Sequence, residues 1–255
     1  MTRKAALVTG ASRNIGRAIV MKLAQDGYEV GVHYRRHAGA AEEIRDAIEA
    51  AGGRAVCIQG DLTSLDDIQR IFDTFLEAFG RIDVLVNNAG ITRSRPFLEV
   101  TLDQWQEVVN TDWRACFFCT QRAARAMIDA RTGGAVVNIS SNHQDGCWPT
   151  ANVYGPTKAA LNKFTRHAAM ELARDGIRVN AVAPGYTLPD GAETGKKKVM
   201  PEVEGRIPLQ RCARASEIAD AVAFLVSGKA AYITGACLTV DGGALLPVVP
   251  ENHFP

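Results

Sequence analysis

Three side chains in the second half of the sequence have the types and spacing needed for proton transfer at an alcohol or a carbonyl. Tyr154 and Lys158 lie four residues apart in the segment Tyr-Gly-Pro-Thr-Lys, and Ser141 lies thirteen residues before Tyr154. In a helix, this spacing puts the lysine one turn from the tyrosine on the same face. A free phenol has a pKa of about 10, and a nearby positive charge favours the phenolate. Ser141 can hydrogen-bond the substrate oxygen. The alternative is a half-buried helix aromatic beside a solvated lysine.

A glycine-rich turn near the start of the chain is typical of a site that holds a dinucleotide. The segment Thr9–Gly16 follows the apolar run Ala5–Val8 and precedes a helical pattern. Gly10 and Gly16 let the chain turn sharply and let phosphates approach the backbone, where the helix start offers free N–H groups. Asn14 stands where a middle glycine is common, and asparagine tolerates the left-handed backbone. The alternative is a tight strand-to-helix connection. Together with the proton-transfer group, the turn predicts hydride transfer between a nicotinamide and a carbonyl.

The residues after the second apolar strand indicate which dinucleotide binds. An acidic residue near this point normally binds the ribose hydroxyls of NAD, and positions 31–41 contain none. Tyr34, Arg35 and Arg36 stand there instead, and Arg13 lies in the glycine turn. A 2′-phosphate carries roughly −1.5 to −2 charges, which suits guanidinium groups by charge and fork geometry. We therefore predict NADP(H) rather than NAD(H). The alternative is that Arg35 and Arg36 are ordinary surface charges.

Polar residues also follow the next two predicted strands, where ligands of open parallel sheets bind. Asp61 follows the third strand and could meet the adenine amino group, and Asn87–Gly90 follows the fourth. Either segment could instead be a turn in which a side chain bonds the backbone.

Strand-like and helix-like patterns alternate along the chain. Apolar runs predict strands at 5–8, 30–34, 55–58, 82–86, 135–140, 179–183 and 236–240. Helical periodicity and end signals predict helices at 15–26, 40–51, 64–79, 102–130, 153–174 and 217–226. Ser64 is expected to cap the third helix, with Asp67 completing a capping box. The alternation predicts an α/β fold, a single doubly wound Rossmann domain over residues 1–255, whose parallel sheet carries helices on both faces.

Composition argues against several classes of function. With 29 basic and 28 acidic residues, the net charge of +1 gives no indication of binding to nucleic acid or to an anionic membrane. The apolar stretches are too short for a membrane span or a signal peptide, so we expect a cytoplasmic protein. Six cysteines do not suggest a disulfide framework in such a chain. Cys116 and Cys119 have the Cys-x-x-Cys form without a second pair, so we expect small buried apolar residues and no metal site.

Taken together, these residues resemble the short-chain dehydrogenase/reductase family in its ~250-residue form. The resemblance covers nearly the whole chain. It is carried, in this order, by Thr9–Gly16, Asp61, Asn87–Gly90, Asn110, Ser141, Tyr154, Lys158, Pro184-Gly185 and Asp241-Gly242-Gly243. It implies a Rossmann domain of about seven strands, assembled into homotetramers, or sometimes dimers, through the helices at 102–130 and 153–174.

The resemblance also implies roles for individual residues. The catalytic set would be Asn110, Ser141, Tyr154 and Lys158, with Asn110 holding a water in a proton relay to Lys158. The residues predicted to bind the cofactor are Gly10, Ser12, Arg13, Asn14, Ile15, Gly16, Tyr34, Arg35, Arg36, Asp61, Leu62, Asn88, Ala89, Gly90, Tyr154, Lys158, Pro184, Gly185 and Thr187. Thr187 comes somewhat earlier than the family's usual hydroxyl near the nicotinamide amide.

The segment after Ser141 departs from the family pattern and should border the substrate. The residues predicted to meet the substrate are Ser141, His143, Trp148, Tyr154 and Tyr186. His143 either donates a hydrogen bond to a polar substrate or packs within its loop, and Trp148 forms a wall of the site or part of the core. Residues 186–211 are expected to form a substrate loop. The apolar tail at 244–255 is expected to pack on its own subunit or on a neighbouring one, near a substrate pocket.

These observations favour an NADPH-dependent carbonyl reductase, reversible as an alcohol dehydrogenase, that acts on a small molecule. Within that class, the candidates are 3-oxoacyl-carrier-protein reductase and the reductases or dehydrogenases of sugars, polyols or small ketones. A rival from another class is a non-catalytic NADP(H)-binding sensor. Such a sensor would not need the set of Ser141, Tyr154 and Lys158.

Overall fold

Seven apolar segments form one parallel sheet in the computed structural model, which describes residues 3–189 and 201–246. The strands are β1 (Ala5–Val8), β2 (Glu29–Tyr34), β3 (Ala55–Gln59), β4 (Val84–Asn87), β5 (Gly134–Ile139), β6 (Ile177–Pro184) and β7 (Cys237–Val240). Their order in the sheet is β3-β2-β1-β4-β5-β6-β7. The order reverses between β1 and β4, which is the point where ligands of doubly wound folds bind.

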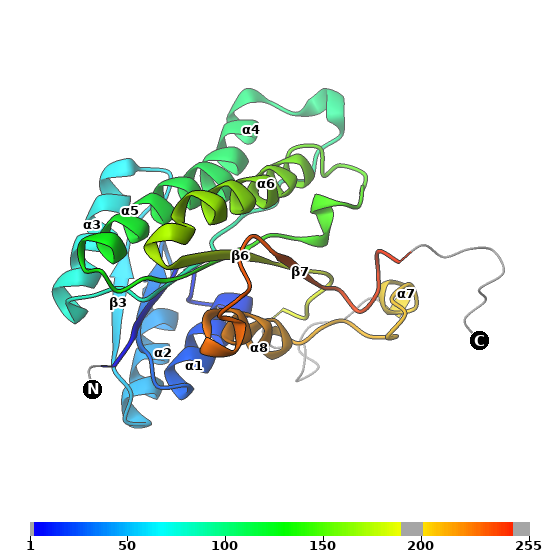
Figure 1. The fold of residues 1–255 in the computed structure, drawn as a ribbon. Helices are drawn as coiled ribbons and strands as arrows, with labels where there is room; N and C mark the ends of the chain where they lie inside the picture. Colours follow the sequence, from blue (N-terminus) through cyan, green and yellow to red (C-terminus); the bar gives the residue numbers. More distant parts are fainter. Residues whose placement is uncertain (1–2, 190–200, 247–255) are drawn as a thin grey trace.

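Helices cover both faces of this sheet (Figure 1). One face carries α1 (Asn14–Gln25), α2 (Ala38–Ala50) and α8 (Ala215–Val226). The other carries α3 (Leu65–Phe79), α4 (Leu102–Val109), α5 (Ala115–Asp129) and α6 (Tyr154–Leu172). A short helix α7 (Pro201–Glu204) precedes α8, and 3₁₀ turns lie at Phe97–Glu99, Asn142–Gln144, Ala173–Asp175 and Gly228–Ala230. The predicted doubly wound α/β fold is confirmed.

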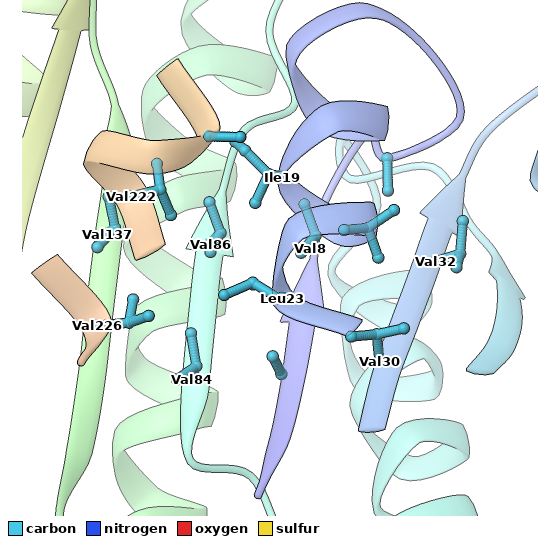
Figure 2. Packing of buried hydrophobic residues seen from close by; sticks show 14 of the residues in the cluster. Val8, Ile19, Leu23, Val30, Val32, Val84, Val86, Val137, Val222 and Val226 are labelled. Carbon is cyan, nitrogen blue, oxygen red and sulfur yellow. The ribbon is translucent and has the colours of Figure 1, made fainter. Parts of the chain in front are cut away.

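Strand residues alternate between two apolar layers because successive side chains point to opposite faces of a sheet. In β1, Ala6 and Val8 belong to the layer beneath α1, α2 and α8, whereas Ala5 and Leu7 belong to the layer beneath α3, α5 and α6. Figure 2 shows the first layer, in which Ile19 of α1 and Val222 of α8 lie over the valines of the strands. This burial holds the strand ends, and therefore the loops that follow them, in fixed positions.

The predicted helix at 102–130 is interrupted by a π turn at Asn110–Arg114, between α4 and α5. Such turns occur often at functional sites because the added residue changes which side chains face inward. At the start of α3, the Ser64 side chain accepts a hydrogen bond from the Asp67 N–H, as predicted. The Asp67 carboxylate accepts the Asp61 N–H (2.6 Å) instead of closing a capping box.

A buried chain of amides and hydroxyls crosses the layer between the sheet and helices α5 and α6. Asn87 Nδ2 donates to Asn138 Oδ1 (2.8 Å) and to Thr120 Oγ1 (3.0 Å). Asn138 Nδ2 donates to Thr165 Oγ1 (2.9 Å), whose hydroxyl donates to the Leu161 carbonyl. This chain ties β4 and β5 to α5 and to α6, the helix that carries Tyr154 and Lys158.

The predictions about the cysteines and about membrane spans can be compared with this fold. Cys116 and Cys119 are buried free thiols in α5, as predicted. Among the described helices, none is both long and apolar enough to cross a membrane. Part of the predicted substrate loop (190–200) and most of the tail (247–255) lie outside the described residues.

Candidate active site

The glycine turn packs directly against the segment that follows β4. Gly10 has φ +62°, and a Cβ there would lie 2.9 Å from the Ala89 Cα. A Cβ at Gly16 would overlap the Gly10 carbonyl oxygen and lie 2.5 Å from Asn88 Nδ2. Asn14 has φ +48°, the left-handed conformation that its position in the turn predicted. Both glycines are therefore required by close backbone approach at the mouth of the sheet.

Thr9 joins these two segments by hydrogen bonds that the sequence did not predict. Its Oγ1 accepts from the N–H groups of Asn88 (2.9 Å) and Ala89 (3.0 Å). The Asn88 amide in turn donates to the carbonyls of Thr9 (2.9 Å) and Gly10 (3.0 Å). The two predicted cofactor motifs thus form one hydrogen-bonded unit across β1 and β4.

His33 supports the same turn from below. Its Nδ1 accepts the Gly10 N–H (3.0 Å), and its Nε2 lies 3.2 Å from the Gly60 carbonyl, which assigns the proton to Nε2. The ring is 2% exposed, and this burial lowers the pKa of His33 to about 4. His33 is therefore neutral at pH 7, unlike the basic residues that follow it.

Charged residues gather where β2 and β3 end. Arg35 is half-buried and its Nη1 lies 3.5 Å from Asp61 Oδ2, while Arg36 and Arg13 are exposed. Burial alone would raise the pKa of Asp61, but hydrogen bonds from Thr63 and the Arg35 charge lower it overall. The carboxylate therefore stays ionised and holds Arg35 at the edge of the sheet. Tyr34 is half-buried at the end of β2, and Leu62 is buried.

The structure brings Ser141, Tyr154 and Lys158 together at the carboxyl end of β5. Tyr154 is the first residue of α6, and the Lys158 Nζ lies 5.4 Å from the centre of its ring. The same Nζ donates to the Ile139 carbonyl (3.1 Å). Ser141 is buried just beyond β5, and its Oγ accepts the His143 N–H (3.3 Å). The geometry places a phenol beside a cation, with a serine hydroxyl on the neighbouring loop.

Asp112 is a site residue that the sequence reasoning missed. Its Oδ2 lies 3.1 Å from Lys158 Nζ, and its Oδ1 accepts the Ile91 N–H (2.8 Å). Both side chains are buried, with 0% of Asp112 and 4% of Lys158 exposed. Asn110, predicted to reach Lys158 through a water, is half-buried two residues earlier in the same π turn. Its relay role stays a prediction, whereas the direct partner of Lys158 is Asp112.

The ion pair fixes the charge of the lysine. Burial alone would lower the pKa of Lys158, but the charges of Asp112, Tyr154 and Cys116 and the hydrogen bond to Asp112 together raise it above its ordinary value. Burial also raises the pKa of Asp112, and the Lys158 charge opposes that rise. Gly90 makes room for the pair, since a Cβ at this position would lie 2.8 Å from Asp112 Oδ2 and 3.4 Å from Lys158 Nζ. The third residue of the Asn-Ala-Gly segment is therefore a glycine for steric reasons.

Aromatic rings line the other side of Tyr154. The His143 ring stacks on Trp148 (centroids 4.0 Å apart, 15°) and meets Tyr154 edge-on (5.2 Å, 77°). Trp148 Nε1 donates to the Tyr186 hydroxyl (3.1 Å). Burial lowers the pKa of His143, so the ring is neutral at pH 7. The predicted substrate residues thus form one connected cluster beside the phenol.

The segments after β6 and β7 close this end of the sheet. A Cβ at Gly185 would lie 2.6 Å from the Asp241 Cβ, so the two chain segments touch here. Pro184 is buried, and the half-buried Thr187 donates its hydroxyl to the Gly185 carbonyl (3.2 Å). In the predicted tail, Leu245 packs close to Gly146. A Cβ placed at Gly146 would lie 2.7 Å from Leu245 Cδ2.

A cavity of about 710 Å³ lies at the opposite end of the sheet, among the amino ends of β4, β5 and β6. On its wall, Arg81 is paired with Asp83. Because ligands of doubly wound sheets bind at the carboxyl ends of the strands, we assign the active site to the Tyr154 end.

Comparison with known proteins agrees with this geometry. The family model described as enoyl-(acyl carrier protein) reductase matches residues 10–244. The 3-oxoacyl-[acyl-carrier-protein] reductase FabG of Staphylococcus aureus is 40% identical over 240 residues, which are 94% of this chain and 97% of that protein. A reductase of the same description from Synechocystis is 38% identical over 96% of this chain and 98% of its own length.

Solved structures give the same result. The acetoin dehydrogenase YohF of Salmonella typhimurium superposes with a TM-score of 0.92 at 37% identity, over 99% of each chain. An acetoin dehydrogenase from Enterobacter cloacae matches with the same TM-score of 0.92, identity of 37% and coverage of 99% of each chain. The fold, the order of the motifs and these matches lead to one conclusion: the chain belongs to the short-chain dehydrogenase/reductase family of oxidoreductases.

Proposed function

We propose that this protein is an NADPH-dependent oxidoreductase that reversibly reduces a carbonyl to a secondary alcohol, with Tyr154 as the acid and base. The observation that carries the proposal is the meeting of Tyr154, Lys158 and Ser141 at the same strand ends as the glycine turn. A non-catalytic sensor of NADP(H) would need the turn but not the proton-transfer group.

The residues around the turn fit a dinucleotide. The neighbouring atoms leave no room for a side chain at Gly10 or Gly16. Helix α1 begins at Asn14, and the N–H groups of its first turn lie at the carboxyl ends of the strands. An extended anion can therefore approach the backbone and the helix start. Ser12, Ile15, Asn88 and Ala89 lie in the same two segments and are proposed to line this part of the site, together with Pro184, Gly185 and Thr187 near the nicotinamide.

The preference for NADP(H) over NAD(H) is proposed from the charges at the end of β2. Arg35 lies 3.5 Å from Asp61, and two further arginines are exposed, Arg36 just after β2 and Arg13 in the glycine turn before α1. Guanidinium groups can bind a 2′-phosphate through paired hydrogen bonds. An acid that accepts ribose hydroxyls, as in NAD sites, is absent from positions 31–41 of the sequence.

Proton transfer is proposed to pass through the phenol. The bound reduced nicotinamide supplies the hydride for the carbonyl carbon. Tyr154 donates its hydroxyl proton to the carbonyl oxygen, and in the reverse direction its phenolate takes the proton back from the alcohol. Ser141 donates a hydrogen bond to the same substrate oxygen and holds it beside the phenol. Lys158 stabilises the phenolate through its positive charge.

The substrate is proposed to be a small carbonyl compound with polar groups. The stacked rings of His143 and Trp148, with the Tyr186 hydroxyl at their edge, offer a flat wall and several hydrogen-bonding atoms beside Tyr154. The solved relatives named acetoin dehydrogenases support small hydroxyketones, and the relatives named 3-oxoacyl-carrier-protein reductases support acyl thioesters. Sugars and polyols remain a third group to test.

Assembly and location are further proposals. Large apolar side chains are exposed on α4, α5 and α6, including Leu102 (68%), Trp105 (48%) and Met170 (70%). Exposed apolar groups on neighbouring helices support a homotetramer, or a dimer, built on these helices. A cytoplasmic location stays a prediction.

A substrate panel tests the proposal. NADPH consumption is measured with acetoin and related hydroxyketones, 3-oxoacyl thioesters, keto sugars and simple ketones, and each assay is repeated with NADH. Tyr154→Phe keeps the ring and its contacts but removes the hydroxyl, so kcat should fall at least about a hundredfold. Near-normal turnover in this variant, or no consumption of either cofactor with any substrate, would refute the proposal.

A further inference from the structure

Arg114, the last residue of the π turn between α4 and α5, reaches the turn that follows β3. Its Nη2 donates to the Thr63 carbonyl, 51 positions earlier in the chain. We propose that this contact makes Arg114 a positioning residue for the adenosine half of NADP(H), because it fixes the turn that carries Asp61 and Leu62. This role rests on the dinucleotide site proposed above. Arg114 acts in it through the turn and not by touching the cofactor.

The turn at residues 61–64 is tied together by acidic side chains. Asp61 Oδ1 accepts both the N–H (2.9 Å) and the hydroxyl (2.8 Å) of Thr63. The Asp67 carboxylate accepts the Asp61 N–H (2.6 Å). Among the described residues, the Leu62 N–H has no hydrogen-bond partner. A carboxylate that accepts and an N–H that can donate therefore lie on adjacent residues, which matches the amino donor and the neighbouring ring-nitrogen acceptor of adenine.

Arg114 holds this turn at its middle. The ends of the turn are fixed by the secondary structure, since β3 ends at Gln59 and α3 begins at Leu65. The Thr63 carbonyl lies between them, and within the described parts of the chain Arg114 is its hydrogen-bond donor. The base of Arg114 is itself held in place, because α5 begins at Ala115, which is buried in the apolar layer beneath α3, α5 and α6.

Loss of this contact should weaken binding of the adenosine half and leave the chemical step unchanged. Thr63 is bonded to the Asp61 carboxylate, so a Thr63 carbonyl without its charged donor frees the group that faces the adenine. The turn must then be ordered when the cofactor binds, and this ordering reduces affinity. The proton-transfer group lies at β5 and α6, and in the described structure Arg114 makes no hydrogen bond there.

Isothermal titration calorimetry with adenosine 2′,5′-bisphosphate, the adenosine half of NADP(H), measures this role without any chemistry at the nicotinamide. Arg114→Met removes the donors and keeps an unbranched stem, so it should raise the Kd for the bisphosphate and for NADPH by the same factor, about fivefold or more. Arg114→Lys keeps a cationic donor, and its Kd should lie nearer to that of the wild type. In steady-state assays, Arg114→Met should raise KM for NADPH and keep kcat and the carbonyl KM within about twofold.

Arg125→Met is the matched control because it makes the same chemical change at an exposed position of α5. Its Kd values should equal those of the wild type. If Arg114→Met does not fold, as judged by circular dichroism, Arg114→Gln replaces it with the same expected loss, because its amide is too short to reach Thr63.

A folded neutral variant that binds the bisphosphate as the wild type does, or that loses kcat at an unchanged Kd, would overturn the role of Arg114 and leave the proposed reaction intact. A wild type that binds neither NADPH nor NADH would overturn both. Tighter binding of ADP than of the bisphosphate by the wild type would contradict the NADP(H) preference alone, and the same loss in Arg114→Met, measured with ADP, would then support the role of Arg114.

Discussion

The buried imidazole of His33 should make the stability of this protein depend steeply on pH between 6.5 and 4. Its pKa is lowered from the ordinary value of 6.5 to about 4, because the folded protein buries the ring and uses Nδ1 to accept the Gly10 N–H. In this window, the unfolded chain binds a proton that the folded chain does not. Acidification therefore favours unfolding, by up to about 1.4 kcal/mol per pH unit and about 3 kcal/mol in total.

Urea unfolding followed by tryptophan fluorescence at a series of pH values measures this effect. His33→Asn retains a carbonyl oxygen that can accept the Gly10 N–H but cannot be protonated in this range. The variant should be less stable at pH 7, and its free energy of unfolding should fall about 3 kcal/mol less than that of the wild type between pH 7 and 4. His167→Asn, at an exposed position of α6, is the control and should follow the wild type. Parallel curves for the wild type and His33→Asn would refute the reasoning.

Two further predictions concern the cofactor. Replacing Arg35 and Arg36 together by serine should raise KM for NADPH about tenfold or more and change KM for NADH little, because only NADPH carries the 2′-phosphate; an unchanged KM for NADPH would exclude these residues as phosphate ligands. Gly16→Ala should abolish binding of NADPH in isothermal titration calorimetry, since its Cβ would overlap the Gly10 carbonyl and approach Asn88 Nδ2 to 2.5 Å. Binding of wild-type strength would contradict the close packing of the turn.

Periodicity predicted the sheet and its helices well because this fold buries most of its strands as continuous apolar runs. The strand at 5–8 was predicted to the residue, and the bounds of the others differ from the observed ones by at most two residues at either end. The long helix at 102–130 was predicted as mostly helical, but the π turn was not. Apolar spacing does not distinguish a regular α-helix from a helix that contains a five-residue π turn. Whether the turn forms depends on which side chains can pack against the neighbouring elements.

The site was predicted less completely, and the residues that were not predicted were missed for one physical reason. The sequence predicted Tyr154, Lys158 and Ser141 together from their types and spacing, which place them in one helix and in the loop that follows the preceding strand. The residues that the sequence reasoning missed contact partners far away in the chain. The partner of Asp112 lies 46 positions away, that of Thr9 lies 79 away and that of His33 lies 23 away. Neither the residue types nor the local spacing of these three indicates a role in the site. Asn110 was predicted from the family resemblance, and its relay role stays a prediction; the same π turn presents Asp112 directly to Lys158.

The hydrogen bond between Asn87 and Asn138 also limits how this core can change through mutation. If either amide is replaced alone by an apolar residue, the other retains buried polar atoms without their partner, at a penalty of about 1–3 kcal/mol. Replacement of both by residues of similar shape removes that penalty, and its remaining cost is the hydrogen bond that Thr120 and Thr165 each lose. The two positions should therefore show strong epistasis: a substitution that is harmful at one becomes tolerable only when the other has already changed.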